Sequence, residues 1–270
     1  MMEPVVQNKS LISEVLHVIL LAGMVASCFP SVSPSLPQDN QRHSREIDTE
    51  VAHWSTQLKS GNPEERREAA MKLSRLEGSA PTSALVAALI DPSPLVRGAV
   101  VASLGERADP STASPLAARL TADKDAFVRK TAAYALGRFS GTERTAALLA
   151  SLKDKDPEVR GAAAVSLGDH AEPAAVVPLE AALSDKSAFV RAQTARALGV
   201  NGSAARQAVP TLIGLLTSDQ DSEVKRQAAT ALGSIGDRSA LQALERATHD
   251  SDPYLAQVAR DSIRMMERTR

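Results

Sequence analysis

Apolar residues recur four positions apart through most of the chain, in two alternating kinds of segment. Val128, Ala132 and Leu136 mark one kind, and leucine pairs such as Leu179 and Leu183 mark the other. A four-residue interval places side chains on one face of a helix, so both kinds of segment are predicted to be amphipathic helices. The pattern predicts an all-α fold.

The helical pattern is organised as a repeat of about 32 residues. The phrase Val-Arg-x-x-Ala/Val-x-x-x-Leu-Gly recurs, and its basic slot falls at positions 66, 97, 129, 160, 191, 225 and 256, the last filled by alanine. Good N-cap residues stand four positions before this slot: Asn62, Ser93, Asp125, Asp156, Ser187, Asp221 and Asp252. The glycine that follows the leucine suits a left-handed helix cap. Each unit is therefore predicted to hold two helices.

An aspartate stands six positions before most of the basic slots. With Val-Arg and Leu-Gly, this interval resembles HEAT repeats, most closely the short type of the bilin lyases, over residues 48–268. The resemblance implies an α-solenoid of about seven two-helix repeats, an armadillo-like superhelix. It also implies a ladder of hydrogen bonds in which Asp91, Asp123, Asp154, Asp185 and Asp219 would pair with Arg97, Arg129, Arg160, Arg191 and Lys225. Ser60, Ala256 and Lys225 depart from the pattern, and the first two fall in end units, where atypical repeats are expected.

The amino terminus differs from the repeats. Val18 to Ala26 is an apolar run, and Val25-Ala26-Ser27-Cys28 resembles the lipobox of bacterial lipoproteins, in which the cysteine is lipidated. We therefore expect a signal peptide over residues 1–27, lipidation at Cys28, and export to the bacterial cell envelope as a membrane-anchored lipoprotein. An uncleaved signal anchor, or cleavage at another position, remains open. Residues 28–47 hold three prolines and little apolar spacing, which predicts a disordered tether.

Composition narrows the possible chemistry. Basic and acidic side chains number 31 and 32, which argues against a nucleic-acid partner, and the single cysteine excludes an internal disulfide or a multi-cysteine zinc site. No nucleophile elbow, phosphate loop or dinucleotide fingerprint is present. Deoxyhypusine hydroxylases have similar repeats with His-Glu dipeptides, and this chain has none. We predict no catalytic residue, no metal site and no cofactor.

Two acidic clusters have structural explanations. Pairs such as Asp123 and Asp125 are accounted for as ladder partner and helix cap rather than as a cation site. The segment Asp169-His170-Ala171-Glu172 is the densest titratable cluster and is predicted to be a solvated loop. A lyase-like activity stays open, because the phycobilin lyases have no short catalytic signature.

A binding surface is the remaining candidate for function. In HEAT solenoids the second helices line the concave side, and the candidate groove residues there are Arg67, Met71, Lys130, Tyr134, Val165, Arg196, Arg226 and Thr230. Gly98 and Gly161 would leave bare backbone, whereas Phe127 and Phe189 are predicted to be packing residues.

The leading hypothesis is a non-enzymatic scaffold, tethered to a membrane through Cys28, that binds a protein or peptide partner in this groove. One alternative is a lyase-like enzyme or chaperone that acts on a chromophore-binding or other partner protein. Another is a structural envelope protein that binds cell-wall polymer.

Overall fold

The structure is a computed structural model that describes residues 38–268, with side chains from residue 42 onward. The chain divides after Glu46 into two units, and the stack of helices described below is the second, which begins at Ile47. Cys28 and the expected signal peptide lie outside the described residues.

Every regular element within residues 38–268 is helical, and the helices alternate in two sets. The first helices of the units are α2 (Gln38–Gln57), α4 (Ser79–Ala87), α6 (Ala113–Ala122), α8 (Thr142–Ser151), α10 (Val176–Ala182), α12 (Val209–Ser218) and α14 (Leu241–Ala247). The second helices are α3 (Pro63–Leu73), α5 (Pro94–Arg107), α7 (Ala126–Leu136), α9 (Pro157–Gly168), α11 (Ala188–Val200), α13 (Ser222–Ile235) and α15 (Pro253–Arg268). Short 3-10 turns adjoin several first helices: η1 (Ala88–Ile90), η2 (Pro110–Thr112), η3 (Pro173–Ala175), η4 (Gly202–Ala208) and η5 (Arg238–Ala240).

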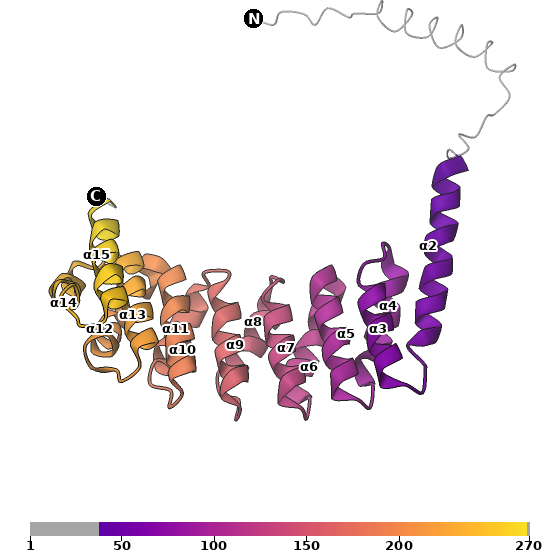
Figure 1. The fold of residues 1–270 in the computed structure, drawn as a ribbon, viewed down its shortest axis with the longest axis horizontal. Helices are drawn as coiled ribbons and strands as arrows, with labels where there is room; N and C mark the ends of the chain where they lie inside the picture. Colours follow the sequence, from indigo (N-terminus) through magenta and orange to yellow (C-terminus); the bar gives the residue numbers. More distant parts are fainter. Residues whose placement is uncertain (1–37, 269–270) are drawn as a thin grey trace, which may run out of the picture. The chain divides into compact units, whose positions relative to one another are not determined.

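The units stack in chain order. Each second helix packs against the second helix of the next unit, from α3 through to α15 (Figure 1). The leucines predicted to face the core are fully buried, among them Leu136 and Leu167 of second helices and Leu148 and Leu179 of first helices. The predicted seven-unit, all-α solenoid is confirmed.

The predicted start of the repeats at residue 48 agrees with the division after Glu46, but the last part of the predicted tether is helical. The tether was expected to reach residue 47, but α2 begins at Gln38, so residues 38–47 are helical. This stretch has no proline or glycine, and Arg42 and Glu46 form an ion pair one turn apart at 3.8 Å. The helix then continues into the stack, where Val51 and Trp54 pack against the core.

The caps at the starts of the second helices follow the sequence closely. Asn62, Asp125, Asp156 and Asp221 each accept a hydrogen bond from a backbone N–H in the first turn, as predicted for N-caps. Asp252 accepts one from Tyr254. Ser93 and Ser187 occupy the N-cap position without a side-chain bond. The second helices therefore begin where predicted, at the residue that directly follows each N-cap.

The glycines near the ends of the second helices serve another purpose than the one predicted. None of Gly105, Gly137, Gly168, Gly199 and Gly233 has a positive φ, so these glycines do not form the predicted left-handed caps. A Cβ added to Gly168 would lie 2.8 Å from Cα and 2.9 Å from Cβ of Ala197 in the next unit. The absence of a side chain lets α9 and α11 approach closely, and close approach is the reason for the glycine.

The arginines of the repeat connect neighbouring units. Arg129 donates from Nε and Nη2 to both carboxylate oxygens of Asp154 in the next unit, at 2.7 and 2.8 Å, and from Nη1 to the backbone carbonyl of Asp123 in its own unit at 3.0 Å. The same three bonds recur in four other units, where Arg66, Arg97, Arg160 and Arg191 bind the carboxylates of Asp91, Asp123, Asp185 and Asp219.

The predicted pairing is thus wrong by one unit. Arg97 reaches the carboxylate of Asp123 and meets only the backbone of Asp91. The carboxylate of Asp91 is bound by Arg66, which the predicted ladder omitted. An arginine suits this position because two N–H groups of its guanidinium match the two carboxylate oxygens of the aspartate. A third N–H group remains to bind the backbone carbonyl.

The last rung departs from this pattern. Lys225 stands in the basic slot, but the neighbouring Arg226 makes the contact to the last unit, with Nη1 2.7 Å from Oδ2 of Asp252. Asp250, six residues before the empty slot at Ala256, accepts only the backbone N–H of Asp252 among the described contacts. The predicted pairing of Lys225 with Asp219 is therefore wrong: Arg191 binds the carboxylate of Asp219, and Arg226 makes the contact between the last two units.

The ladder lowers the pKa of its carboxyl groups. For Asp219 the largest effect is the hydrogen bond from Arg191, which lowers the pKa and outweighs burial. For Asp154, burial is the largest single effect and raises the pKa, but hydrogen bonds from Arg129 and from the backbone N–H of Asp156, with nearby positive charge, together bring it below the usual value.

Replacing Gly168 with alanine is expected to destabilise the stack by about 1–3 kcal/mol, because the new methyl group meets the backbone of α11. Gly214 of α12 is the matched control: a Cβ there has nothing within 4 Å, so Gly214→Ala is expected to stabilise by about 0.5–1 kcal/mol through helix propensity. Urea unfolding of both variants measures the effect. Equal shifts at the two positions would contradict the packing explanation.

Stability is expected to fall in acid. A carboxyl group whose folded-state pKa lies below the unfolded value of about 3.9 contributes stability that is complete above that pH and is lost as the pH drops through the folded value. The melting temperature should therefore be nearly constant from neutral pH to about pH 5 and fall steeply below about pH 4. In Asp219→Asn the melting temperature should be lower at neutral pH and its acid decline shallower. A melting temperature unchanged between pH 5 and 3 would argue against the ladder.

Candidate interaction surface of the second helices

The predicted groove residues all lie on second helices and all reach solvent. Arg67, Met71, Tyr134, Arg196 and Thr230 are exposed, and the remaining three are half-buried. Met71 and Tyr134 keep 47% and 43% of their surface, which is high for such large side chains. Corresponding positions of successive units lie next to each other, so these side chains form one row across the second helices. We call these eight side chains the second-helix surface.

Two positions of this surface differ from expectation. Gly98 and Gly161 were expected to leave backbone bare, but both are buried. A Cβ at Gly98 would lie 2.2 Å from Cε1 of Phe127 in the next unit, and one at Gly161 would lie 2.1 Å from Cε1 of Phe189. The glycines therefore make room for phenylalanine rings, and Phe127 and Phe189 pack as predicted on that side, although Phe127 keeps 45% of its surface exposed.

Lys130, Tyr134 and Glu158 form a small polar group where α7 meets α9. The ammonium group of Lys130 lies 3.7 Å from a carboxylate oxygen of Glu158. Partial burial, and then the negative charge of Glu158, raise the pKa of Tyr134. The phenol therefore stays protonated at neutral pH and keeps a hydroxyl donor at the surface.

Val165 and Arg196 line a common crevice between α9 and α11. Gln193 and Val200 complete its sides with Asp169, and its volume is only about 10 Å³. Such a crevice is too small for a drug-sized ligand, which needs several hundred Å³. At this point the surface offers a shallow contact area that mixes aliphatic and charged groups.

The outer members of the row are held by neighbours on their own helices. Arg67 pairs with Glu64 at 2.7 Å. Arg226 pairs with Glu223 at 3.0 Å besides its contact with Asp252. The hydroxyl group of Thr230 donates to the carbonyl of Arg226 at 3.0 Å. Arg226 thus belongs to the ladder as well as to the surface, and its positive charge is already paired with two carboxylates.

The segment Asp169 to Glu172 is exposed at its first three residues, as predicted for a solvated loop, but Glu172 is half-buried and has a structural partner. The carboxylate of Glu172 forms an ion pair with Arg144, whose side chain is fully buried. Arg144 also donates to the carbonyl groups of Leu136 and Ser166, and His170 contacts the carbonyl of Gly137 at 2.7 Å. Burial lowers the pKa of Arg144, and the negative charge of Asp169 opposes that effect. The cluster joins the ends of α7 and α9, which is a structural role.

The Asp-x-Asp pairs combine a ladder carboxylate with a helix cap, as predicted, except that each arginine comes from the preceding unit and Asp250 has no arginine partner among the described contacts. In Asp123 and Asp125, the first carboxylate is bound by Arg97 and the second caps α7. Across residues 38–268 no group of three or more His, Cys, Asp or Glu side chains is placed to hold a metal ion. Over the same range, no helix combines the length and the apolar character needed to cross a bilayer.

The repeat geometry agrees with a family profile. The profile of HEAT repeats matches residues 51–137, 122–199 and 178–264, together most of the stack. The chain belongs to the HEAT-repeat family. No protein with curated annotation matches it.

Solved structures with the same fold extend the comparison of this HEAT-repeat chain. YibA of Escherichia coli aligns with a TM-score of 0.63 at 16% identity, over 99% of this chain and 100% of the other. The complex of CpcE and CpcF of phycocyanin lyase from Nostoc sp. aligns with a TM-score of 0.50 at 22% identity, over 87% and 90%. An engineered protein aligns with a TM-score of 0.54 at 23% identity, over 80% and 68%. At these identities the likeness shows the fold alone.

Proposed function

We propose that this HEAT-repeat chain is a non-enzymatic scaffold that binds a protein or peptide partner across its second-helix surface and is held at a bacterial membrane by a lipid on Cys28. The observation that carries the proposal is the row of accessible side chains on successive second helices. Met71, Tyr134 and Arg196 combine thioether, aromatic and guanidinium groups, and tyrosine and arginine are enriched among binding hot spots.

The shape of the surface favours an extended partner. Its crevice between α9 and α11 is too small for a ligand, so affinity would come from contacts spread over several units. Glycines such as Gly168 let the second helices approach closely, and a stack whose two layers differ in spacing curves toward the closer one. A concave surface of this kind fits a rounded or extended polypeptide, as HEAT-type solenoids use their inner faces.

The charge of the chain is consistent with a protein partner. Basic and acidic side chains are balanced overall, and most arginines of the repeat are neutralised inside the ladder. The similar Nostoc structure is a complex of two proteins, CpcE and CpcF, which supports association with another chain as a use of this fold. We assign no substrate or pigment to this protein.

A photo-crosslinking amino acid at position 134 tests the surface. In cells that make the full chain, a group placed there should give a discrete crosslinked product, because it replaces an exposed aromatic in the centre of the row. The same group at position 83, an exposed serine of α4 in the other layer, is the control. Identical products at both positions, or none at 134, would contradict the proposal.

A double substitution provides a quantitative test with the captured partner. Tyr134→Ala/Arg196→Glu is expected to weaken binding by about tenfold or more, since each hot spot contributes more than about 1 kcal/mol. Arg246→Glu on α14, exposed in the first-helix layer, should leave affinity within about twofold. Partner recovery that is the same for all three proteins would exclude this surface.

The tether has a separate test. Cys28→Ala is expected to move the protein from the membrane fraction to the soluble fraction and to abolish incorporation of labelled palmitate, because the thiol is the acceptor of the lipid. Ser27→Ala keeps a small residue before the cysteine and should leave both unchanged. A Cys28→Ala protein that stays in the membrane would indicate a signal anchor.

A further inference from the structure

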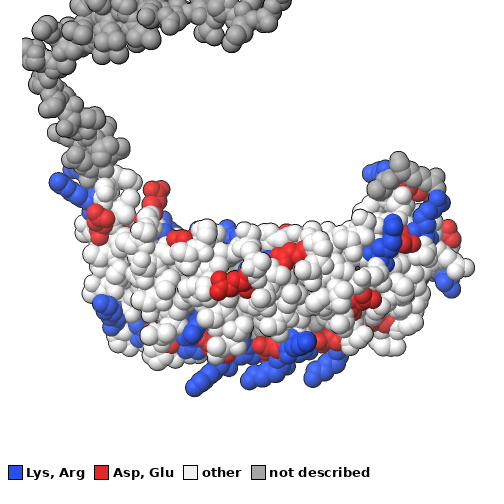
Figure 2. Space-filling model, turned by 180° about the vertical axis from the view of Figure 1, so that it is seen from behind, with Lys and Arg blue, Asp and Glu red and all other residues white. Residues whose placement is uncertain are grey.

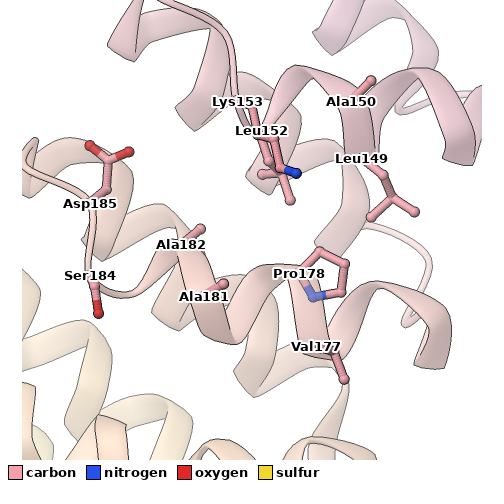
Figure 3. A pocket seen from close by; sticks show the side chains of 10 residues that line it. All are labelled: Leu149, Ala150, Leu152, Lys153, Val177, Pro178, Ala181, Ala182, Ser184 and Asp185. Carbon is pink, nitrogen blue, oxygen red and sulfur yellow. The ribbon is translucent and has the colours of Figure 1, made fainter.

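The first-helix layer has an open apolar groove where α8 faces α10. It has a volume of about 590 Å³, and Leu149, Leu152, Val177 and Pro178 form much of its wall. Figure 3 shows Leu149 on the α8 side and Pro178, Ala181 and Ala182 along the α10 side. Other neighbouring first helices, such as α6 and α8, pack directly against each other. A smaller groove of about 250 Å³ lies at the corresponding place between α12 and α14, so the groove between α8 and α10 is the larger of the two.

The small size of the residues on α10 accounts for the opening. α10 extends only from Val176 to Ala182, and it presents Ala181 and Ala182 to the groove, which leave the space of larger side chains unfilled. Val177 is an aliphatic side chain that keeps 64% of its surface in contact with solvent. Exposed aliphatic groups around a groove of this size favour insertion of an apolar side chain.

Lysines gather at the end of the groove near the ladder. Lys153 lines the groove, and Lys186 follows directly after the lining residue Asp185. Lys155 belongs to the neighbouring turn, which Arg160 ties to the next one by bonds to the carbonyl of Asp154 and the carboxylate of Asp185. The two turns therefore lie side by side.

These lysines lie near carboxylates but are not bound to them: the charges of Lys155 and Lys186 contribute to lowering the pKa of Asp154 and Asp185. All three are exposed, and none forms an ion pair with a carboxylate among residues 42–268. Asp185 is the acidic group of the groove, and its carboxylate is already bound by Arg160 and by the backbone N–H of Ser187. Figure 2 shows Lys and Arg side chains projecting along the edge formed by these turns.

We infer that the α8–α10 groove binds a peptide segment of another protein in which an apolar anchor is followed by several carboxylates. The anchor occupies the space between Leu149 and Ala181, and the carboxylates meet Lys153, Lys155 and Lys186. A peptide is favoured over a membrane because the groove has walls that fit an apolar side chain. Binding to an anionic bilayer would require only the lysines. This surface lies on the opposite layer from the second-helix surface, so either proposal can fail without the other.

Fluorescence anisotropy with labelled peptides tests the inference. The probes carry a pair of leucines, isoleucines or phenylalanines followed by a run of glutamates, with glutamine versions as controls. The protein is the full chain with Cys28→Ala, so that no lipid contributes. We expect binding that weakens with salt, as expected for exposed charges, and that is lost for the glutamine peptides. Failure of every glutamate probe to bind with a Kd below about 1 mM would overturn the inference.

Two variants address the two halves of the groove. Lys153→Glu/Lys155→Glu/Lys186→Glu and, separately, Ala181→Trp should each lower peptide affinity by about tenfold or more. The controls are Lys124→Glu, at the equivalent turn of the preceding unit, and Ala87→Trp, at the equivalent position of α4. Circular dichroism checks that each variant is folded.

The same variants also distinguish the peptide from other possible ligands of the groove. Binding to phosphatidylglycerol vesicles that depends on the lysines but not on Ala181 would indicate a membrane surface and overturn the peptide assignment. A dimer in sedimentation experiments that Ala181→Trp dissociates would indicate a second copy of the chain, with the same consequence. Peptide affinity unchanged in both groove variants would show that the groove is not the site.

Discussion

The arrangement of this protein depends on one repeated interaction, the fork of hydrogen bonds from an arginine to the aspartate of the following unit. Arg129 joins its own turn, through the carbonyl of Asp123, to the next turn, through the carboxylate of Asp154. Each rung thus fixes two neighbouring turns at one edge of the stack. The helices that start at these turns are held in register, and the glycines between second helices then permit their close approach.

The register has consequences on both layers. On the second helices it aligns Met71, Tyr134 and Arg196 in one row, although they are far apart in sequence. On the turns it places Lys155 and Lys186 at corresponding positions of neighbouring units, where Lys186 directly follows the groove residue Asp185. A small set of internal bonds, with their charges neutralised, therefore positions the exposed residues from which the proposed interactions are built. In each repeat, the arginine and aspartate of the ladder are paired with each other, whereas other charged side chains remain exposed.

The sequence was sufficient for features that depend on local spacing. The apolar interval of four and the caps such as Asp156 are decided within a few residues, and they are found where predicted. The ladder partner of Arg97 depends on the distance between units, which no interval within one unit reveals. The residues next to Gly168 in the sequence do not distinguish a helix cap from a site of close helix packing. The contact with Ala197 of the next unit shows that the glycine serves close packing. The burial of Arg144 against Glu172, 28 residues away, had no signal in the periodicity.

A double-mutant cycle on Arg129 tests the inter-unit ladder most directly. Arg129→Met combined with Asp154→Asn should show a coupling energy of about 1–3 kcal/mol in unfolding experiments, because the two side chains share two hydrogen bonds. Arg129→Met combined with Asp123→Asn should show less than about 0.5 kcal/mol, since Arg129 meets only the backbone of Asp123. A larger coupling with Asp123 than with Asp154 would contradict the account.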